Sequence, residues 1–171
     1  MTRERLLLLA AASASLLACK ASPPGRLERA IASQVKLHLT VGGRSDRNPL
    51  EASDDNLRRG QRAFGSYCTV CHGLDGRATG VPFAEAMSPP VPSLASPEVQ
   101  AYSDGQLRWI IENGLFPSGM PASRGILGDE EMWGIVLFLR RLPAAGSLGD
   151  PPVYGGAPPT PQAMGVSNPP R

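Results

Sequence analysis

Residues 68–72 read Cys68-Thr69-Val70-Cys71-His72, so two thiols lie three positions apart and a histidine follows directly. At this spacing both cysteines can face one planar ring, and each can form a thioether with a vinyl group of haem. The ring of His72 can then reach the iron from the same side. The motif therefore predicts one covalently attached haem c, held by Cys68 and Cys71, with His72 as an axial ligand of the iron.

Three other interpretations of this motif agree less well with the remaining sequence. A redox-active disulfide between the cysteines would normally sit at a strand-to-helix turn of a βαβ unit, and no such unit is predicted. A structural zinc site needs about four ligands, and the only other cysteine and histidine are Cys19 and His38. A structural disulfide would leave His72 without a role. Haem attachment explains all three side chains.

Composition limits the classes of protein to which this chain can belong. Its 171 residues include 17 basic and 15 acidic side chains, a formal net charge of +2 without the clustered basic surplus typical of nucleic-acid binding. Three cysteines are too few for a disulfide-dense secreted scaffold. The 19 glycines and 18 prolines gather largely in loops and at the C-terminal end, so the ordered part should be shorter than the chain.

Residues 1–18 have the features of an export signal. A short charged start precedes residues 6–18, which carry no charge and are too few to span a bilayer. Leu16-Leu17-Ala18-Cys19 resembles the lipobox of bacterial lipoproteins, in which the cysteine is lipidated and becomes the new N-terminus. The resemblance implies a lipid anchor on Cys19 in a bacterial membrane, with the rest of the chain facing the periplasm. The alternative is an ordinary signal peptide with an incidental cysteine.

Three segments have helical patterns, which predicts an all-α fold. They cover residues 54–67, the stretch from Ser103 to Asn113, and Glu130 to about Leu142. Each follows a residue suited to an N-cap, and the second begins with Ser103 and Gln106 in the spacing of a capping box. Asp129 is expected to cap the third helix.

The helices define a folded domain at residues 54–143. Residues 19–53 form the predicted tether and lead-in, and residues 144–171 form a predicted disordered tail rich in Pro and Gly. Residues 73–102 and 115–128 are expected to be long loops. A domain this small with loops this long is short of hydrophobic core, so a bound group should fill its centre.

Beyond the attachment motif, the sequence resembles the class I c-type cytochromes over residues 57–142. Gly60 and Phe64 match the glycine and the aromatic residue of the family's first helix, where glycine allows a close crossing with the last helix. Trp133 and Phe138 fall in a last helix of the expected kind. The resemblance implies a small class I cytochrome c fold, with three main helices and long loops wrapped around one covalent haem.

The resemblance also assigns groups around the iron. Pro92-Ser93-Leu94 is similar to the family's Pro-x-Leu step, in which the Pro carbonyl accepts a hydrogen bond from the ligand histidine and the Leu packs on the ring. Gly119-Met120-Pro121 resembles the loop that supplies the second axial ligand, which implies Met120 as that ligand. Met87, in the first long loop, is the next candidate. Less suited are Met132 in the last helix, Met164 in the tail and His38 upstream of the domain.

Three further side chains could contact the haem propionates, namely Trp109, Arg77 and Arg124. The indole N–H of Trp109 is a hydrogen-bond donor, and the two guanidinium groups carry the complementary charge. Each can equally be an ordinary surface residue.

The predicted function is the transfer of single electrons. A haem with both axial positions taken has no open site for a substrate, and the sequence contains no phosphate-binding loop, G-x-S-x-G motif or catalytic carboxylate pair. We therefore expect a membrane-tethered electron carrier rather than an enzyme. It would work between redox partner proteins, a donor complex and an acceptor oxidase or reductase, and would bind no nucleic acid. Two alternatives stay open: a fixed haem subunit of a multi-subunit dehydrogenase or oxidase, and a haem ligand binder or peroxidase with an open sixth position.

Overall fold

The computed structural model describes Gly25, residues 41–116 and residues 118–157. The chain divides into two compact units, Met1–Val35 and Lys36–Arg171, and all contacts given below belong to the second unit. The predicted signal peptide, Cys19 and the predicted tail beyond residue 157 lie outside the described residues. Within the described ranges, no helix is both long enough and apolar enough to cross a membrane.

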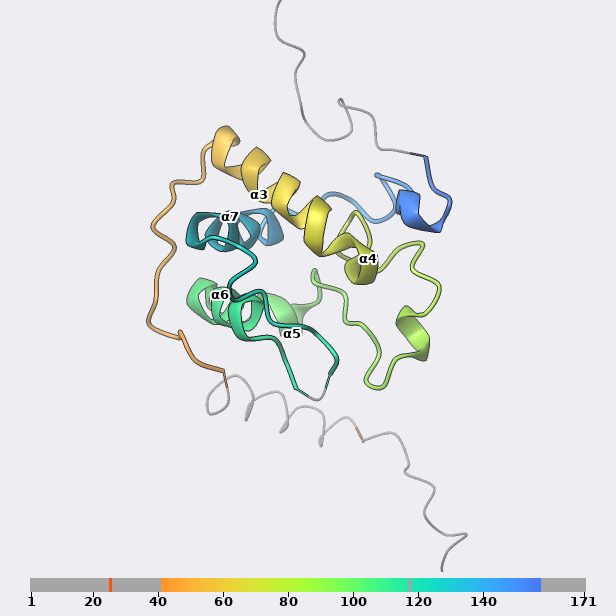
Figure 1. Ribbon diagram of the computed structural model, residues 1–171, viewed down its shortest axis with the longest axis horizontal. Helices are drawn as coiled ribbons and strands as arrows, with labels where there is room; N and C mark the ends of the chain where they lie inside the picture. The colour runs from red at the N-terminus through yellow and green to blue at the C-terminus, as the bar shows by residue number, and fades with distance from the viewer. Residues whose placement is uncertain (1–24, 26–40, 117, 158–171) are drawn as a thin grey trace, which may run out of the picture. The chain divides into compact units, whose positions relative to one another are not determined.

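The described part of the chain is helical, with no strand in residues 41–116 and 118–157. Its longer helices are α3 (Asp54–Tyr67), α6 (Asp104–Asn113) and α7 (Asp129–Leu139). The shorter elements are α4 (Thr69–His72), α5 (Pro97–Gln100) and the 3-10 turns η2 (Ala84–Ala86) and η3 (Pro152–Tyr154). Figure 1 shows α7 between α3 and α6, and it packs on both. The all-α prediction is confirmed. The short elements η2 and α5 were not predicted, since both lie within residues 73–102, which were expected to be a loop.

Local caps fix where the longer helices begin. The Ser53 hydroxyl caps α3, and the capping box predicted at Ser103 is formed at α6. The expectation that Asp129 caps the last helix is wrong by one residue. Gly128 is the N-cap of α7, and its backbone N–H donates to the carboxylate of Glu131 at 2.8 Å. Asp129 lies instead in the first turn, where its negative charge suits the helix dipole.

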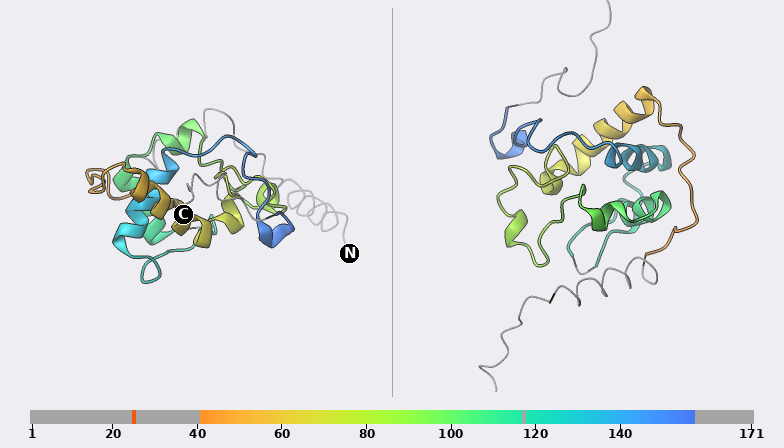
Figure 2. Two further views of the ribbon diagram at one scale, coloured as in Figure 1. Left: turned by 90° about the horizontal axis from the view of Figure 1, so that it is seen from above. Right: turned by 180° about the vertical axis from the view of Figure 1, so that it is seen from behind.

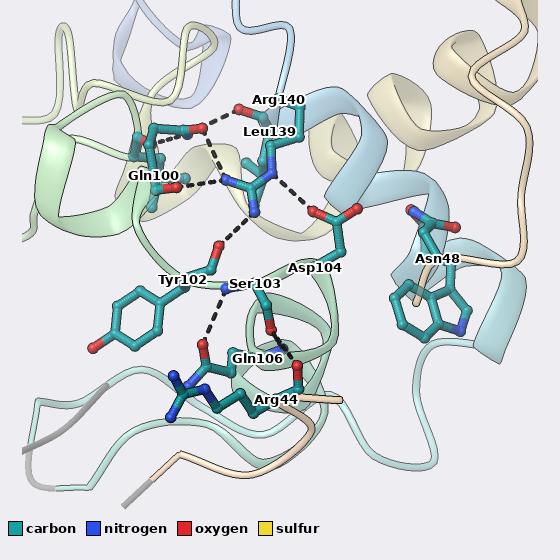
Figure 3. A network of polar contacts seen from close by, with 11 residues as sticks. Arg44, Asn48, Gln100, Tyr102, Ser103, Asp104, Gln106, Leu139 and Arg140 are labelled. Carbon is teal, nitrogen blue, oxygen red and sulfur yellow. Dashed lines mark hydrogen bonds and ion pairs between the residues drawn. The ribbon is translucent and has the colours of Figure 1, made fainter. Parts of the chain in front are cut away.

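Helix α7 ends just before Arg140, earlier than the predicted end at about Leu142. The Arg140 guanidinium donates to the carboxylate of Asp104 at 2.9 Å, to the carbonyl of Gln100 at 2.9 Å and to the carbonyl of Tyr102. These bonds join the end of α7 to α5 and to the start of α6 (Figure 3). Arg140 thus links three segments that are far apart in the sequence.

Helices α3 and α7 cross with their backbones in contact at Gly60 and Gly134. A Cβ on Gly60 would overlap the carbonyl oxygen of Gly134. One turn further along each helix, the rings of Phe64 and Phe138 pack with centroids 5.1 Å apart. The close crossing implied for Gly60 is therefore confirmed. The core around it also contains Ala63, Leu107, Ile111, Leu127, Met132, Trp133, Ile135, Val136 and Leu139.

Residues 41–53, which belong to the predicted lead-in, run past the ends of α7 and α6 (Figure 2) and contact both helices. The side chain of Asn48 donates to the carbonyl of Trp133 at 3.0 Å. A Cβ on Gly105 would overlap the carbonyl oxygen of Gly43, so the lead-in crosses the start of α6 in backbone contact. The domain therefore includes this segment, and its N-terminal edge lies before the predicted boundary at residue 54.

Residues 144–157 pack on the domain, so the prediction that 144–171 is a disordered tail is wrong for this part. Leu148 is buried, and both the backbone N–H of Gly146 and the hydroxyl of Tyr154 donate to groups of the domain. Proline restricts the unfolded chain, so a Pro-rich segment loses less conformational entropy on folding and needs fewer contacts to stay in place.

Gly60→Ala should lower the free energy of unfolding by about 1–3 kcal/mol, because the added methyl group overlaps the backbone of α7 and pushes the helices apart. Chemical denaturation of the purified protein measures the change. Gly65→Ala in the same helix is the matched control, since its Cβ would meet nothing within 4 Å and alanine favours helix. Equal destabilisation by the two substitutions would contradict the crossing.

Candidate haem-binding site

The attachment motif begins at Cys68, the residue between α3 and α4, and its other four residues form α4. The N–H of Cys68 donates to the carbonyl of Phe64 at 2.9 Å, and the carbonyl of Cys68 accepts from the N–H of His72 at 3.0 Å. The backbone therefore winds almost continuously from α3 to His72, which keeps the motif on one helical turn. Cys68 and Cys71 form no disulfide with each other, and both are half-buried.

Burial sets the charge state of the motif. It raises the pKa of the Cys68 thiol to about 12, with a smaller contribution from Cys71, and it lowers the pKa of His72 to about 4. Cys68 is therefore protonated and His72 neutral at pH 7. A neutral imidazole is the form that binds a metal. The Nδ1 atom of His72 is buried and has no hydrogen-bond partner, which is unusual for a buried ring nitrogen and suits a site completed by a bound group.

The hydrogen bond implied from His72 to the carbonyl of Pro92 is not formed, because Nδ1 of His72 has no partner. Pro92 is exposed. The segment around it is held by other backbone bonds, from Leu94 N–H to the carbonyl of Gly76 at 2.7 Å and from Val91 N–H to the carbonyl of Ala84 at 3.0 Å. These bonds anchor the Pro-x-Leu step to the attachment loop.

The structure brings Cys68, Leu94 and Met120 to the same hydrophobic core. All three are partly buried and pack against the cluster that contains Phe64 and Phe138. They come from three segments that are distant in the sequence: the motif, the first long loop and the second long loop. The same apolar surroundings are therefore shared by Cys68, which attaches haem, by Leu94, predicted to pack on its ring, and by Met120, the predicted second axial ligand.

Met120 lies in a loop that folds back on the end of α6. The N–H of Leu115 donates to the carbonyl of Met120 at 3.1 Å, and a Cβ on Gly114 would come within 2.6 Å of that carbonyl oxygen. Met87 approaches the same loop, since its methyl carbon lies 3.3 Å from the position of a Cβ on Gly119. The structure thus places both candidate thioethers beside one loop, and only Met120 packs on the core cluster.

Asp75 is a buried carboxylate that the sequence analysis did not single out. Burial alone would raise its pKa, but hydrogen bonds from Gly146, Thr79 and Arg77 hold the pKa of Asp75 below its ordinary value. The carboxylate is therefore ionised at pH 7. The sequence could have indicated two of these bonds, because the spacing of Asp75 to Arg77 and Thr79 suits an Asx turn. The bond from Gly146, which is 71 positions away, has no local signal.

The three candidate propionate partners all have contacts within the protein. Trp109 lies against Gly42 of the lead-in, where a Cβ would come within 2.6 Å of its indole nitrogen. Arg77 donates to the carbonyls of Asp75 and Pro143. The third, Arg124, pairs with Glu112 at 3.2 Å and donates to Asn113 at 2.8 Å. These contacts account for the three side chains without a propionate.

A comparison with family models adds to this geometry. The model described as cytochrome c oxidase, cbb3-type, subunit III matches residues 55–139, which contain the attachment motif, Met120 and the crossing of α3 with α7. Residues 55–139 form a c-type cytochrome domain. No curated protein matches the chain. The cytochrome match ends at Leu139, so residues 144–157 lie beyond it.

The cofactor of this cytochrome is one covalently bound haem c. The residues present fit it: two cysteines at the attachment spacing, a half-buried neutral His72, and a half-buried thioether at Met120 on the core that Cys68 also contacts. When bound, haem c supplies an iron centre that gains or loses one electron. The chain's part is to hold the ligands, exclude water and set the surrounding charges.

Met120→Ala should remove the weak far-red absorption band that methionine sulfur gives with ferric iron, and the spectrum should become high-spin. Absorption spectroscopy of the oxidised cytochrome measures this. Met87→Ala is the matched control, because that side chain lies beside the same loop but does not pack on the core cluster. Loss of the band in Met87→Ala with its retention in Met120→Ala would reverse the ligand assignment.

Proposed function

We propose that this cytochrome is a monohaem electron carrier, tethered to a bacterial membrane, that passes single electrons between a donor complex and an acceptor oxidase or reductase. The observation that carries the proposal is the half-buried His72, with its buried and unpartnered Nδ1, next to Cys71 and close to Cys68, with Met120 on the core that Cys68 contacts. Two axial ligands leave no iron position for a substrate. Such a site exchanges electrons without binding a reactant.

The proposed tether gives the domain room to reach its partners. A lipid on Cys19 would fix the N-terminal end at the membrane surface, and two or more acyl chains make such attachment stable. Between the proposed lipid site and Val41, where the first continuous described stretch begins, the sequence has 21 residues, Lys20 to Thr40. Fully extended, they reach about 70 Å at most. A carrier on such a tether could meet a donor and an acceptor in the same membrane.

A second candidate function is a fixed haem subunit of a larger oxidoreductase. It is favoured by the description of the matched family, subunit III of a cytochrome c oxidase. Purification after mild detergent extraction separates the two. A stoichiometric oxidase or dehydrogenase partner would support the fixed subunit, whereas a carrier should come away alone.

The reduced cytochrome should bind carbon monoxide only slowly, because Met120 must leave the iron first. Stopped-flow mixing of the reduced protein with carbon monoxide measures the rate, and Met120→Ala should bind it much faster. Rapid binding by the unsubstituted protein would mean an open sixth position. That result would replace the carrier with a ligand binder or peroxidase.

Cys19→Ser should move the cytochrome from the membrane fraction to the soluble periplasmic fraction without loss of haem. Cell fractionation followed by in-gel haem detection measures both. Ser15→Ala, in the same N-terminal segment, is the control and should leave the protein in the membrane fraction. A Cys19→Ser protein that stays with the membrane would contradict the lipid anchor.

A further inference from the structure

Residues 143–157, which we call the C-terminal strap, pack on the loop that follows the attachment motif. The N–H of Gly146 donates to the carboxylate of Asp75 at 2.9 Å, and the hydroxyl of Tyr154 donates to the carbonyl of Val70, inside the motif, at 2.8 Å. The rings of Phe83 and Tyr154 meet edge-on, with centroids 6.1 Å apart. Figures 1 and 2 show the strap in blue beside α4 and this loop. The strap therefore touches both the motif and the loop.

The contact between strap and loop is close at particular points, and two strap side chains are buried. A Cβ on Gly80 would overlap the side chain of Asp150. Leu148 is 8% exposed, and Pro151 is among the most deeply buried side chains of the described part. Such close packing leaves little room for water between the two segments.

Asp75 is enclosed by this contact. It is 1% exposed, and its carboxylate accepts from the N–H groups of Gly146 and Arg77, both at 2.9 Å, and from the hydroxyl of Thr79 at 2.6 Å. Three donors aimed at one carboxylate stabilise its ionised form. A fixed negative charge therefore lies at a buried position, shielded from solvent, three residues after His72.

Arg77 supplies a fixed positive charge next to it. Its guanidinium donates to the carbonyl of Asp75 at 3.1 Å and to the carbonyl of Pro143, the first residue of the strap. The side chain is half-buried, so its charge is also partly shielded from water. The loop thus presents two opposite charges, and the negative one is the more deeply buried.

We propose that the strap seals Asp75 near the haem so that its negative charge lowers the haem reduction potential, and that Arg77 raises this potential. Ferric haem carries one more positive charge than ferrous haem, so a nearby anion favours the ferric form and a nearby cation disfavours it. Charges interact more strongly in buried surroundings than in water. The inference rests on the attachment of haem at Cys68 and Cys71.

Potentiometric titration of the full-length haem-loaded protein tests the two charges. Asp75→Asn keeps the shape of the side chain and should raise the midpoint potential, whereas Arg77→Gln should lower it. Thr79→Val removes one hydrogen bond to Asp75 but no charge, and should leave the potential close to that of the unsubstituted protein. A disturbed loop would not shift the first two variants in opposite directions. Unchanged potentials, or shifts of the same sign, would overturn the proposal.

A second pair of variants tests the role of the strap. Leu148→Ser places a hydroxyl at a buried position and should detach the strap, while Val153→Ser alters an apolar strap residue that is 64% exposed. Water that enters after detachment screens the charges, so the shift caused by Arg77→Gln should shrink in the Leu148→Ser background and persist in the Val153→Ser background. Equal shifts in both backgrounds would show that the strap does not seal the site. This pair decides the question even where Asp75→Asn fails to fold.

Haem staining of each denatured variant separates this inference from the proposed function. Unsubstituted protein without covalent haem would refute haem attachment itself. Stained variants whose potentials do not move would refute only the inference about Asp75, Arg77 and the strap.

Discussion

The backbone contact between Gly60 and Gly134 is the constraint on which the rest of the domain depends. Two glycines let α3 and α7 approach closely, and this places the Phe64 and Phe138 rings against each other. Helix α3 runs directly into Cys68, so the crossing also fixes where the attachment motif begins. The helix crossing is therefore joined without a linker to the residues that carry the chemistry.

The rest of the haem-binding site is positioned by contacts between segments that are distant in the sequence, and less by the helices themselves. Leu94 and Met120 reach the core from two loops, and Arg140 ties the end of α7 to α5 and α6. His72 is half-buried, which lowers the pKa of its ring to about 4, and its Nδ1 has no hydrogen-bond partner. A domain this small has little hydrophobic core of its own, so bound haem c contributes to its structure as well as to its function.

Features that depend on a local sequence pattern could be predicted. Features that depend on contacts between distant segments could not. The motif and the capping box at Ser103 are set by residue types at short spacing, whereas the close crossing at Gly60 was implied by the family resemblance and needs Gly134, far along the chain. The order of residues 144–157 was missed, because composition suggested disorder while partners such as Asp75 and Val70 lie far away in the chain. The Pro92 bond was taken from a family resemblance, and here the backbone bonds of Val91 and Leu94 hold that segment while His72 Nδ1 stays unpaired.

The most direct test of the central claim is the intact mass of the purified protein after acidic acetone extraction, which removes haem that is not covalently bound. A cytochrome with haem on Cys68 and Cys71 should keep the added mass of one haem, and a Cys68→Ala, Cys71→Ala double variant should lose it. A polypeptide mass without haem, from protein made together with haem-attachment factors, would contradict the assignment of this motif and the electron-transfer function that follows from it.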